Sequence, residues 1–594
     1  MRNIVIFDFE VFKHDTLLGA RLLIDDKILR FQSWDLDEIR RLYENCQNFI
    51  WIGHNNAGYD NFILQAIVKG ANEEDVKKVN DNIILRGKKP YLTIPLVYYD
   101  LISSHVCQLK AVEAFVGKNI SESEVDFNLD RKLTEDEKRK TEKYNNDDLD
   151  QTYDDFNFLK AEFDLRLEII NEFKLPMSCL SMTGTRVAEE VLHAKKIEGI
   201  EKWYKAPTLW PNLRVKNQEV IDFYLSEEWR NGATLDITLC GTPHKLAAGG
   251  IHGCKRKFHR DWCFYFDVSG YYNLIMILLD LLPRSIDPEY RKYYKEMYEY
   301  QLTLKKIDPH KRSAYKTILL SVFGAMNNEY CRFYDPYHGD LVRLSGEMFL
   351  VDLLEKLEGK AEVAQSNTDG IIAYPINGTT EQQLIDIINE WQNRTGFVLK
   401  LEKIYDLHQR DVNCYMYKDA DGYVHTLGEA VKDYGKWEYP FWKDSFKSKE
   451  PMIISTAICE YYMNHKLPEE VIKENENNLR MFQYVCKKQS FDYMEYEARF
   501  KSTGVQRVTQ MQHVNRAFAL NSTEYDGMLY KRKWDGKKAK VSNLPDSVFV
   551  YNNEILSDKA ISEVKKQIDY DYYIRRAYER IVEFVELDWV NKIA

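Results

Sequence analysis

Two aspartates of this 594-residue chain stand where strand ends could bring their carboxylates together. Asp267 lies near the end of the apolar segment 263–268, and Asp369 lies in an Asn-Thr-Asp-Gly sequence further along the chain. Asn, Asp and Gly favour tight hairpin turns, so a turn is predicted between strands 362–366 and 371–374. Two carboxylates at strand tips can share divalent cations, and two-cation sites drive in-line attack at phosphorus.

A second set of acids occupies the first 150 residues. Asp8 and Glu10 lie on one side of a predicted strand, because strand side chains alternate with a period of two. Asp60 opens a predicted helix, and Tyr144 and Asp148 share a helix face through their spacing of four. Four carboxylates and a tyrosine on an α/β sheet can hold two Mg²⁺ or Mn²⁺ ions and orient a water molecule.

The overall composition is that of an ordinary globular protein with several domains. The formal net charge of −11 argues against a chain coated in nucleic acid, although basic clusters occur at 86–89, 255–260 and 531–540. Ten cysteines without a C-x-x-C pair disfavour a zinc ribbon and a disulfide framework. No apolar run approaches about 18 residues, so a soluble protein in a reducing compartment is expected.

Hydrophobic periodicity predicts an α/β pattern with a mixed sheet at the start of the chain. The predicted strands are 3–9, 17–24, 28–32 and 48–53, and the predicted helices are 35–46, 61–68 and 134–159. Further along we expect an antiparallel helical hairpin, 290–306 with 312–323, and a second β region from 361 to 431 that includes the hairpin 415–427. The remainder is expected to be mostly helical, ending in an amphipathic helix over 574–585.

The acidic motifs of the first 150 residues occur in the order D-F-E, N-x-x-Y-D and Y-x-x-x-D. They resemble the DEDD-type 3′–5′ exonuclease domain of proofreading DNA polymerases. The resemblance implies that Asn56 contacts the substrate strand and that Tyr144 orients the attacking water. It also implies four metal ligands, which are Asp8, Glu10, Asp60 and Asp148. Gln108-Leu109-Lys110 departs from that family, which has Ser or Thr before the Leu.

From Leu246 onward the chain resembles a family B DNA polymerase of the compact bacteriophage kind. Residues 267–273 resemble its motif A, in which Asp267 and the carbonyl of Val268 would bind metal and Tyr272 would exclude a ribose 2′-hydroxyl. Residues 366–370 resemble motif C, with Asp369 as the second aspartate. Asn367 replaces the first aspartate of that motif and, with Thr368, would lie against the DNA.

Residues 316–324 resemble motif B, with Leu320 in place of the family's asparagine. The resemblance implies contacts of Lys316, Phe323 and Gly324 with the incoming dNTP, assisted by Lys305 or Lys306. The implied DNA contacts are Gly249 and Gly250 in an A-A-G-G element, Tyr415 at the primer end, and Lys531, Arg532 and Lys533 in a basic hairpin over 531–540.

Together the resemblances imply an α/β multidomain protein, a ribonuclease H-like exonuclease domain followed by a right-hand polymerase. The expected domains are the exonuclease 1–165, a connector 166–245, a palm 246–288 with 336–438, fingers 289–335 and a thumb 439–594. The implied function is template-directed extension of a primer 3′ end with dNTPs, with 3′–5′ proofreading, in replication of a bacteriophage genome.

The resemblances also imply cofactors and partners. Two Mg²⁺ or Mn²⁺ ions are expected at each of two sites, and primer-template DNA and dNTPs are the expected ligands. A monomer in the bacterial host cytoplasm, without membrane contact, is expected, with a helicase, a sliding clamp or a single-strand binding protein as candidate helpers.

Three alternatives stay open at this point. A DEDD exonuclease with a DNA-binding C-terminal region explains the first domain only. A primer-independent primase-polymerase would start synthesis on an unprimed template. A DNA-binding protein without enzymatic activity would not need acids at strand tips in two domains.

Overall fold

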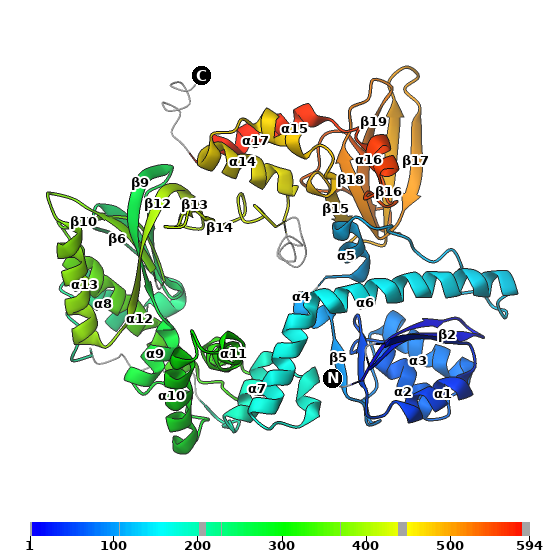
Figure 1. The fold of residues 1–594 in the computed structure, drawn as a ribbon, viewed down its shortest axis with the longest axis horizontal. Helices are drawn as coiled ribbons and strands as arrows, with labels where there is room; N and C mark the ends of the chain where they lie inside the picture. Colours follow the sequence, from blue (N-terminus) through cyan, green and yellow to red (C-terminus); the bar gives the residue numbers. More distant parts are fainter. Residues whose placement is uncertain are drawn as a thin grey trace.

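The computed structural model describes residues 3–25, 27–105, 107–200, 210–226, 228–368, 370–436 and 448–584. The strands of these residues form four sheets, which with the helices give a mixed α/β protein of several domains (Figure 1). Within these ranges no helix is long and apolar enough to cross a membrane.

The first domain contains a five-stranded sheet in the order β3-β2-β1-β4-β5. Its strands are β1 (Ile4–Val11), β2 (Thr16–Ile24), β3 (Lys27–Ser33), β4 (Ile50–Gly53) and β5 (Tyr98–Asp100). β1 pairs antiparallel with β2 and parallel with β4, so the predicted mixed sheet is confirmed. The first four strands were predicted, and the three-residue β5 is too short to give a periodic signal.

The two faces of this sheet are covered by different helices. Val5 and Phe7 of β1 pack with α1 (Leu36–Asn45), α2 (Asp60–Val68) and α3 (Glu73–Arg86). Ile4 and Ile6 pack instead with α6 (Glu135–Glu172). Because side chains alternate along a strand, the even-numbered Asp8 and Glu10 point toward the α6 side.

α6 is a 38-residue helix that starts at a capping box between Thr134 and Glu137 and runs on to Glu172, beyond the predicted end at 159. Its C-terminal part lies beside the middle of the molecule, where Glu172 accepts hydrogen bonds from Tyr315 at 2.7 Å and Lys311 at 3.0 Å. The remaining helices of the first third are α4 (Ile102–His105), α5 (Leu109–Val116) and α7 (Gly184–Val191).

The middle of the chain forms a nine-stranded sheet in the order β14-β13-β12-β9-β11-β10-β8-β7-β6. Its strands are β6 (Leu235–Leu239), β7 (Thr242–Ala247), β8 (Gly250–Cys254), β9 (Phe258–Val268), β10 (Ala361–Asn367), β11 (Gly370–Pro375), β12 (Leu399–Asp411), β13 (Cys414–Lys418) and β14 (Val424–Leu427). The sheet therefore begins inside the segment predicted as a connector, because β6 and most of β7 precede residue 246.

The helices of the middle region support this sheet. They are α8 (Gln218–Leu225), α9 (Tyr271–Leu278), α10 (Pro288–Thr303), α11 (Pro309–Ala325), α12 (Pro336–Leu357) and α13 (Glu381–Thr395). Phe264, Phe266 and Val268 of β9 share one core with α12. The predicted helical hairpin is confirmed as α10 and α11, each of which starts with Pro at its first turn.

The C-terminal region contains α14 (Met452–Asn464), α15 (Pro468–Asn475), α16 (Asp558–Val564) and α17 (Tyr570–Ile581). It also contains β15 (Tyr484–Lys487), β16 (Tyr493–Phe500), β17 (Gln506–Met511), β18 (Val514–Ala519), β19 (Tyr525–Arg532), β20 (Lys538–Lys540) and β21 (Val548–Val550). The prediction of a mostly helical remainder is therefore wrong. β16 and β17 carry many charged and polar side chains, so their sequences lack the apolar alternation of a half-buried strand.

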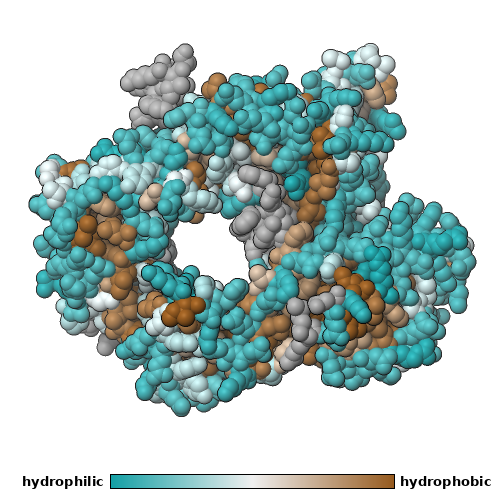
Figure 2. Space-filling view, in the orientation of Figure 1, coloured by the Kyte–Doolittle hydropathy of each residue, from teal (hydrophilic) through white to brown (hydrophobic). Residues whose placement is uncertain are grey.

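The C-terminal region also packs against the first domain, so the molecule closes around an opening (Figures 1 and 2). Arg516 of β18 is fully buried and donates hydrogen bonds to the carbonyl oxygens of Ala114 at 3.0 Å and Lys118 at 2.9 Å. Burial lowers the pKa of Arg516 to about 9. On the other side of the opening, α11 packs against α6 and α7.

Candidate functional site

Asp8, Glu10, Asp60 and Asp148 form a cluster in the first domain, here called the four-carboxylate site. One oxygen each of Asp8, Glu10 and Asp148 lie within 4.8 Å of one another. Asp8 and Glu10 come from the α6 side of β1, and Asp148 comes from α6 itself. Asp60 is the first residue of α2, and its Oδ1 accepts a hydrogen bond from the backbone N–H of Phe9 at 3.2 Å.

The loop before Asp60 is held by a carboxylate that the sequence did not reveal. Asp100 accepts hydrogen bonds from the backbone N–H groups of Asn55 at 2.8 Å and Ala57 at 3.1 Å. Asn56, predicted to contact a substrate strand, is fully buried and donates to Oδ1 of Asn61 at 3.3 Å. Its burial fits a role in fixing the loop and does not fit a direct strand contact.

The electrostatics of the four-carboxylate site favour protons or cations. Burial is the largest cause that raises the pKa of Asp8, and repulsion from Glu10, Asp60 and Asp148 adds to it. Burial also raises the pKa values of Glu10 and Asp148, and that of Asp60 to about 7. Ionised carboxylates this close repel one another, so the charged form requires a compensating cation.

Lys110 is a cation that the sequence reasoning did not assign to this site. Its ammonium lies 2.5 Å from Oδ1 of Asp148, 3.2 Å from Oε1 of Glu113 and 4.8 Å from the ring centre of Tyr144. Lys110 enters from α5, so its position depends on how α5 packs on α6. The only sequence signal for this contact was the presence of Lys110 itself in the Gln108-Leu109-Lys110 element.

Tyr144 and Asn145 complete the α6 side of the site. Burial first, and then the charges of Asp148, Glu10 and Asp8, raise the pKa of the Tyr144 phenol, which keeps it protonated. Asn145 donates to Oδ2 of Asp8 at 2.9 Å. A Cβ on Gly19, which pairs with Asp8 across the sheet, would lie 1.8 Å from Oδ1 of Asn145. Only glycine therefore leaves room for this hydrogen bond.

Asp267 lies near the end of β9, in the middle of the nine-stranded sheet. Gly370 of β11 is its register partner on one side, and Lys400 of β12 is its partner on the other. Asp369 lies outside the described residues. We call the surroundings of Asp267 and of the β10–β11 turn the strand-tip site.

The β10–β11 turn is packed against the turn between β7 and β8. Thr368 has a left-handed φ of 48°, and its backbone N–H donates to the carbonyl of Ile251 at 3.2 Å. Its hydroxyl donates to Oδ1 of Asn367 at 3.3 Å. Gly250 has a φ of 137°, and a Cβ there would lie 3.1 Å from Oγ1 of Thr368. The structure thus brings Gly250 to the β10–β11 turn, whereas a Cβ on Gly249 would meet nothing within 4 Å.

α9 and α11 place an aromatic pair beside the strand-tip site. Gly270 has a φ of 61° and starts α9 directly after β9. The rings of Tyr272 and Phe323 are stacked with centroids 4.0 Å apart and planes 15° apart. Lys316 and Gly324 are exposed on the same side of α11 as Leu320, while Ile318 and Val322 are buried on the other side. The segment predicted to be motif B is therefore an amphipathic helix with Phe323 partly buried.

Three predicted contacts do not have the expected surroundings. Lys305 and Lys306 lie beyond the end of α10, in the exposed turn that leads to α11. Tyr415 is buried in an apolar cluster with Ile404 and Leu407. Lys531 is 8% exposed and donates to Oε1 of Gln489 at 2.7 Å.

Tyr417 is an aromatic residue near Asp267 that the sequence reasoning missed. It lies two residues after Tyr415 on β13 and is only half-buried. Burial, followed by Tyr415, Glu402, Asp419 and Asp267, raises the pKa of its phenol. The order Tyr-x-Tyr over 415–417 was a signal that either tyrosine could face the site.

The basic hairpin over 531–540 is confirmed as β19 and β20, with Tyr530 opposite Lys540. Some of its charges are already paired, since Arg532 lies 3.3 Å from Glu495 and Lys538 forms an ion pair with Glu497. Lys533 is half-buried at the strand end, and Lys537 and Lys540 are exposed. Lys540 lies 3.7 Å from Asp546, so a phosphate contact by this hairpin would depend on Lys533 and Lys537 more than on Lys531.

Comparison with known protein families and with curated proteins gives no match. Among solved structures, the chain is similar to the family B DNA polymerase from the hyperthermophilic archaeon Pyrobaculum calidifontis. The TM-score is 0.43 and the sequence identity 13%, over 99% of this chain and 78% of that chain. A likeness of this degree carries no functional argument, so the function is argued from the two sites.

Proposed function

We propose that this protein is a template-directed DNA polymerase that extends a primer 3′ end with dNTPs and removes mismatched ends by 3′–5′ hydrolysis. The observation that carries the proposal is the strand-tip geometry. Gly370, which directly follows Asp369, is the register partner of Asp267. Gly370 is also the register partner of Asn367, so the β10–β11 hairpin ends beside the strand that carries Asp267.

The residues of both sites fit divalent cations that prefer oxygen ligands. Asp8, Glu10, Asp60 and Asp148 would hold them in the first domain, where burial has raised the pKa values of all four. Asp267, Asp369 and the carbonyl of Val268 would hold them at the strand tips. Mg²⁺ or Mn²⁺ supplies activation of the attacking oxygen and charge neutralisation at phosphate.

In the extension reaction, the primer 3′-hydroxyl attacks the α-phosphorus of a dNTP and pyrophosphate leaves. The stacked rings of Tyr272 and Phe323 give a rigid surface beneath the sugar and base of the dNTP. Lys316 is exposed on the α11 face that also carries Phe323, where it can neutralise phosphate charge. Tyr417 lies near Asp267 and can orient the primer end.

In the hydrolytic reaction, a water molecule attacks the last phosphodiester of the strand. Tyr144 stays protonated and can donate a hydrogen bond that fixes this water. Lys110 holds Asp148 in one orientation and adds positive charge next to the scissile phosphate. Asn145 holds Asp8 from the opposite side.

Each region of the molecule would then have a role in the reaction or in holding DNA. The first domain would be a ribonuclease H-like exonuclease, the nine-stranded sheet the palm, α10 and α11 the fingers, and the C-terminal region the thumb. The opening between these regions in Figure 2 would receive the primer-template DNA. Replication of a bacteriophage genome in bacterial cytoplasm, assisted by a helicase, clamp or single-strand binding protein, belongs to the same proposal.

A primer-extension assay with and without dNTPs tests the proposal. Asp267→Ala should abolish extension and spare 3′–5′ hydrolysis, and Asp8→Ala with Glu10→Ala should do the reverse. Loss of both activities in either variant would contradict two separate sites. An unprimed template should give no product, and synthesis on it would instead identify a primase-polymerase.

A DEDD exonuclease with a DNA-binding C-terminal region is the second candidate. It is favoured by one observation, that one oxygen each of Asp8, Glu10 and Asp148 lie within 4.8 Å of one another. Hydrolysis of a labelled strand without any extension, at every dNTP concentration, would support this candidate.

A further inference from the structure

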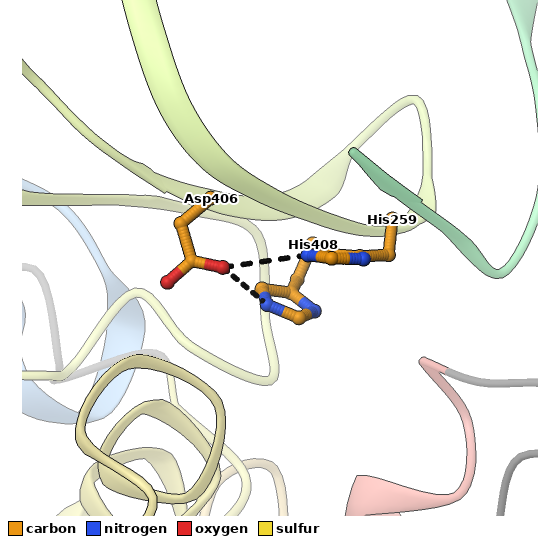
Figure 3. A group of neighbouring side chains, drawn as sticks. All are labelled: His259, Asp406 and His408. Atoms are coloured by element: carbon orange, nitrogen blue, oxygen red, sulfur yellow. Dashed lines mark hydrogen bonds and ion pairs between the residues drawn. The ribbon is translucent and has the colours of Figure 1, made fainter. Parts of the chain in front are cut away.

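Three side chains on the nine-stranded sheet form a cluster that the proposed function does not use. His259 of β9 and His408 of β12 are register partners, and their rings are stacked with centroids 4.3 Å apart. The carboxylate of Asp406 points at both rings (Figure 3). Nε2 of His408 lies 3.0 Å from Oδ1 of Asp406, and Nε2 of His259 lies 3.4 Å from the same oxygen.

Asp406 reaches this position through an irregular backbone. The register of β12 against β13 shifts between Tyr405 and His408, and Asp406 between them has a left-handed φ of 54°. Asp adopts the left-handed conformation more readily than most residues other than glycine, and bulges of this kind often re-aim a side chain at a site. The irregular backbone thereby directs the Asp406 carboxylate toward His259 and His408.

The second oxygen of Asp406 is held from the other side. Lys418 of β13 lies 3.3 Å from Oδ2 of Asp406 and also donates to the carbonyl of Met463 at 2.6 Å. Oδ1 is thereby left facing the two imidazoles. Fixing a carboxylate through its non-ligating oxygen is a common support for metal ligands.

We propose that His259, Asp406 and His408 bind one borderline transition-metal ion such as Zn²⁺. One donor atom of each residue lies within 4.8 Å of the others, as a shared ion requires. For Zn–N and Zn–O bonds near 2.0–2.1 Å, the ligand atoms of a tetrahedral site are about 3.3 Å apart, close to the separations of Asp406 from the histidines. Two imidazoles and one carboxylate favour such an ion over Mg²⁺ or Ca²⁺.

The surroundings of the cluster give the ion access and a fourth ligand. His408 is buried, whereas the side chain of His259 is 41% exposed, so its ring can turn toward an ion that arrives from solvent. Asp261, on the same side of β9, has its Oδ1 3.9 Å from Nε2 of His259. Asp261 or a water molecule can fill the open position.

The location indicates what the ion would do. His259 and Asp267 lie near opposite ends of the 11-residue strand β9, and at about 3.3 Å per residue the two are more than about 20 Å apart. The ion would therefore take no part in chemistry at Asp267. It would join β9 to β12 and, through the ring of Tyr462 that lies 4.6 Å from His408, support the contact with α14. This inference holds independently of the proposed function.

Titration of the chelator-treated full-length protein with Co²⁺ tests the site, because Co²⁺ substitutes for Zn²⁺ and its visible absorption reports nitrogen ligation. Excess Mg²⁺ is present throughout, so that the oxygen sites are occupied. The expected result is a visible band that saturates at one equivalent, and a higher Tm when Zn²⁺ is added. Absence of a saturable band would overturn the proposal.

The deciding variant is His259→Ala, because its side chain is partly exposed and its loss should leave the fold intact. The band should disappear in His259→Ala and in Asp406→Asn. His425→Ala is the matched control, since His425 lies 2.8 Å from Asp419 on the neighbouring hairpin and belongs to no three-residue cluster among the described residues. An unchanged titration in His259→Ala, or equal loss in His425→Ala, would contradict the assignment.

Discussion

The four-carboxylate site and the strand-tip site use the same chemical group in different physical settings. In the first domain, Glu10, Asp60 and Asp148 are each less than 9% exposed, and Lys110 is already paired with Asp148. In the middle sheet, Asp267 is half-buried and is positioned by its strand, with Gly370 and Lys400 on the neighbouring strands. One site is defined by crowded charges and the other by backbone register.

The two sites should therefore respond differently to changes of pH and of divalent-cation concentration. Crowded buried charges oppose folding until protons, Lys110 or metal ions neutralise them, so the stability of the first domain should depend on pH and on divalent cations. A carboxylate at a strand tip has water beside it, so its ionisation should affect catalysis with little effect on folding.

The same isosteric substitution should change stability at the four-carboxylate site and leave it unchanged at the strand-tip site. Asp8→Asn removes a repelling charge, so Tm in EDTA should rise by several degrees, while hydrolysis falls by at least about a hundredfold. Asp267→Asn should lower extension by at least as much and leave Tm unchanged. Thermal unfolding and the two activity assays measure this. Equal changes of Tm in both variants would remove the contrast.

Lys110→Met should weaken the four-carboxylate site in a way that metal ions partly reverse. Removing the ammonium leaves Asp148 without its cationic partner, so Tm in EDTA should fall and hydrolysis should decrease by about tenfold to a hundredfold. The Mg²⁺ concentration for half-maximal hydrolysis should fall, because Lys110 no longer competes with the metal ion for Asp148. Lys118→Met is the matched control, because the Lys118–Asp154 pair is about 40% exposed and contributes little. Similar losses in both variants would argue against a specific role of Lys110.

Stability without divalent ions should fall as the pH rises toward neutrality. The pKa of Asp60 is raised from 3.8 to about 7, so the folded protein holds a proton that the unfolded chain has lost over this interval. Stability from this proton is present at the acidic end and is lost as the pH rises through about 7. Thermal unfolding in EDTA from pH 5 to 8 measures the slope, which Asp60→Asn and added Mg²⁺ should each reduce. A slope unchanged in Asp60→Asn would contradict the assignment.

Phe323→Leu should have the smallest effect, confined to nucleotide binding. Loss of the stacked ring leaves Tyr272 less rigid, so KM for dNTP should rise severalfold while hydrolysis and Tm stay unchanged. Leu320→Ala, on the exposed side of the same helix, is the control and should change KM less. Equal effects of both substitutions would indicate that stacking with Tyr272 is not used.

Local patterns predicted the first four strands, the helical hairpin and the meeting of Asp8, Glu10 and Asp148, because strand alternation and helix spacing decide which side chains share a face. They did not predict the C-terminal strands β15 to β21. The same patterns did not reveal Lys110, since its position depends on the packing of α5 on α6. Lys531 was expected at the surface, but the β16–β19 pairing turns it inward toward Gln489. Tyr415 and Tyr417 occur in one strand, and only the tertiary fold decides which of them is buried.

The helix α5 has a consequence for synthesis of the chain on the ribosome. Its apolar side chains Ala111, Val112 and Ala114 are covered by Met452 and Val514, which are translated more than 300 residues later. The first domain therefore leaves the ribosome with these apolar side chains exposed to solvent. They are buried only when translation is nearly complete. Nascent chains stalled before β18 should accordingly be the ones that need a chaperone.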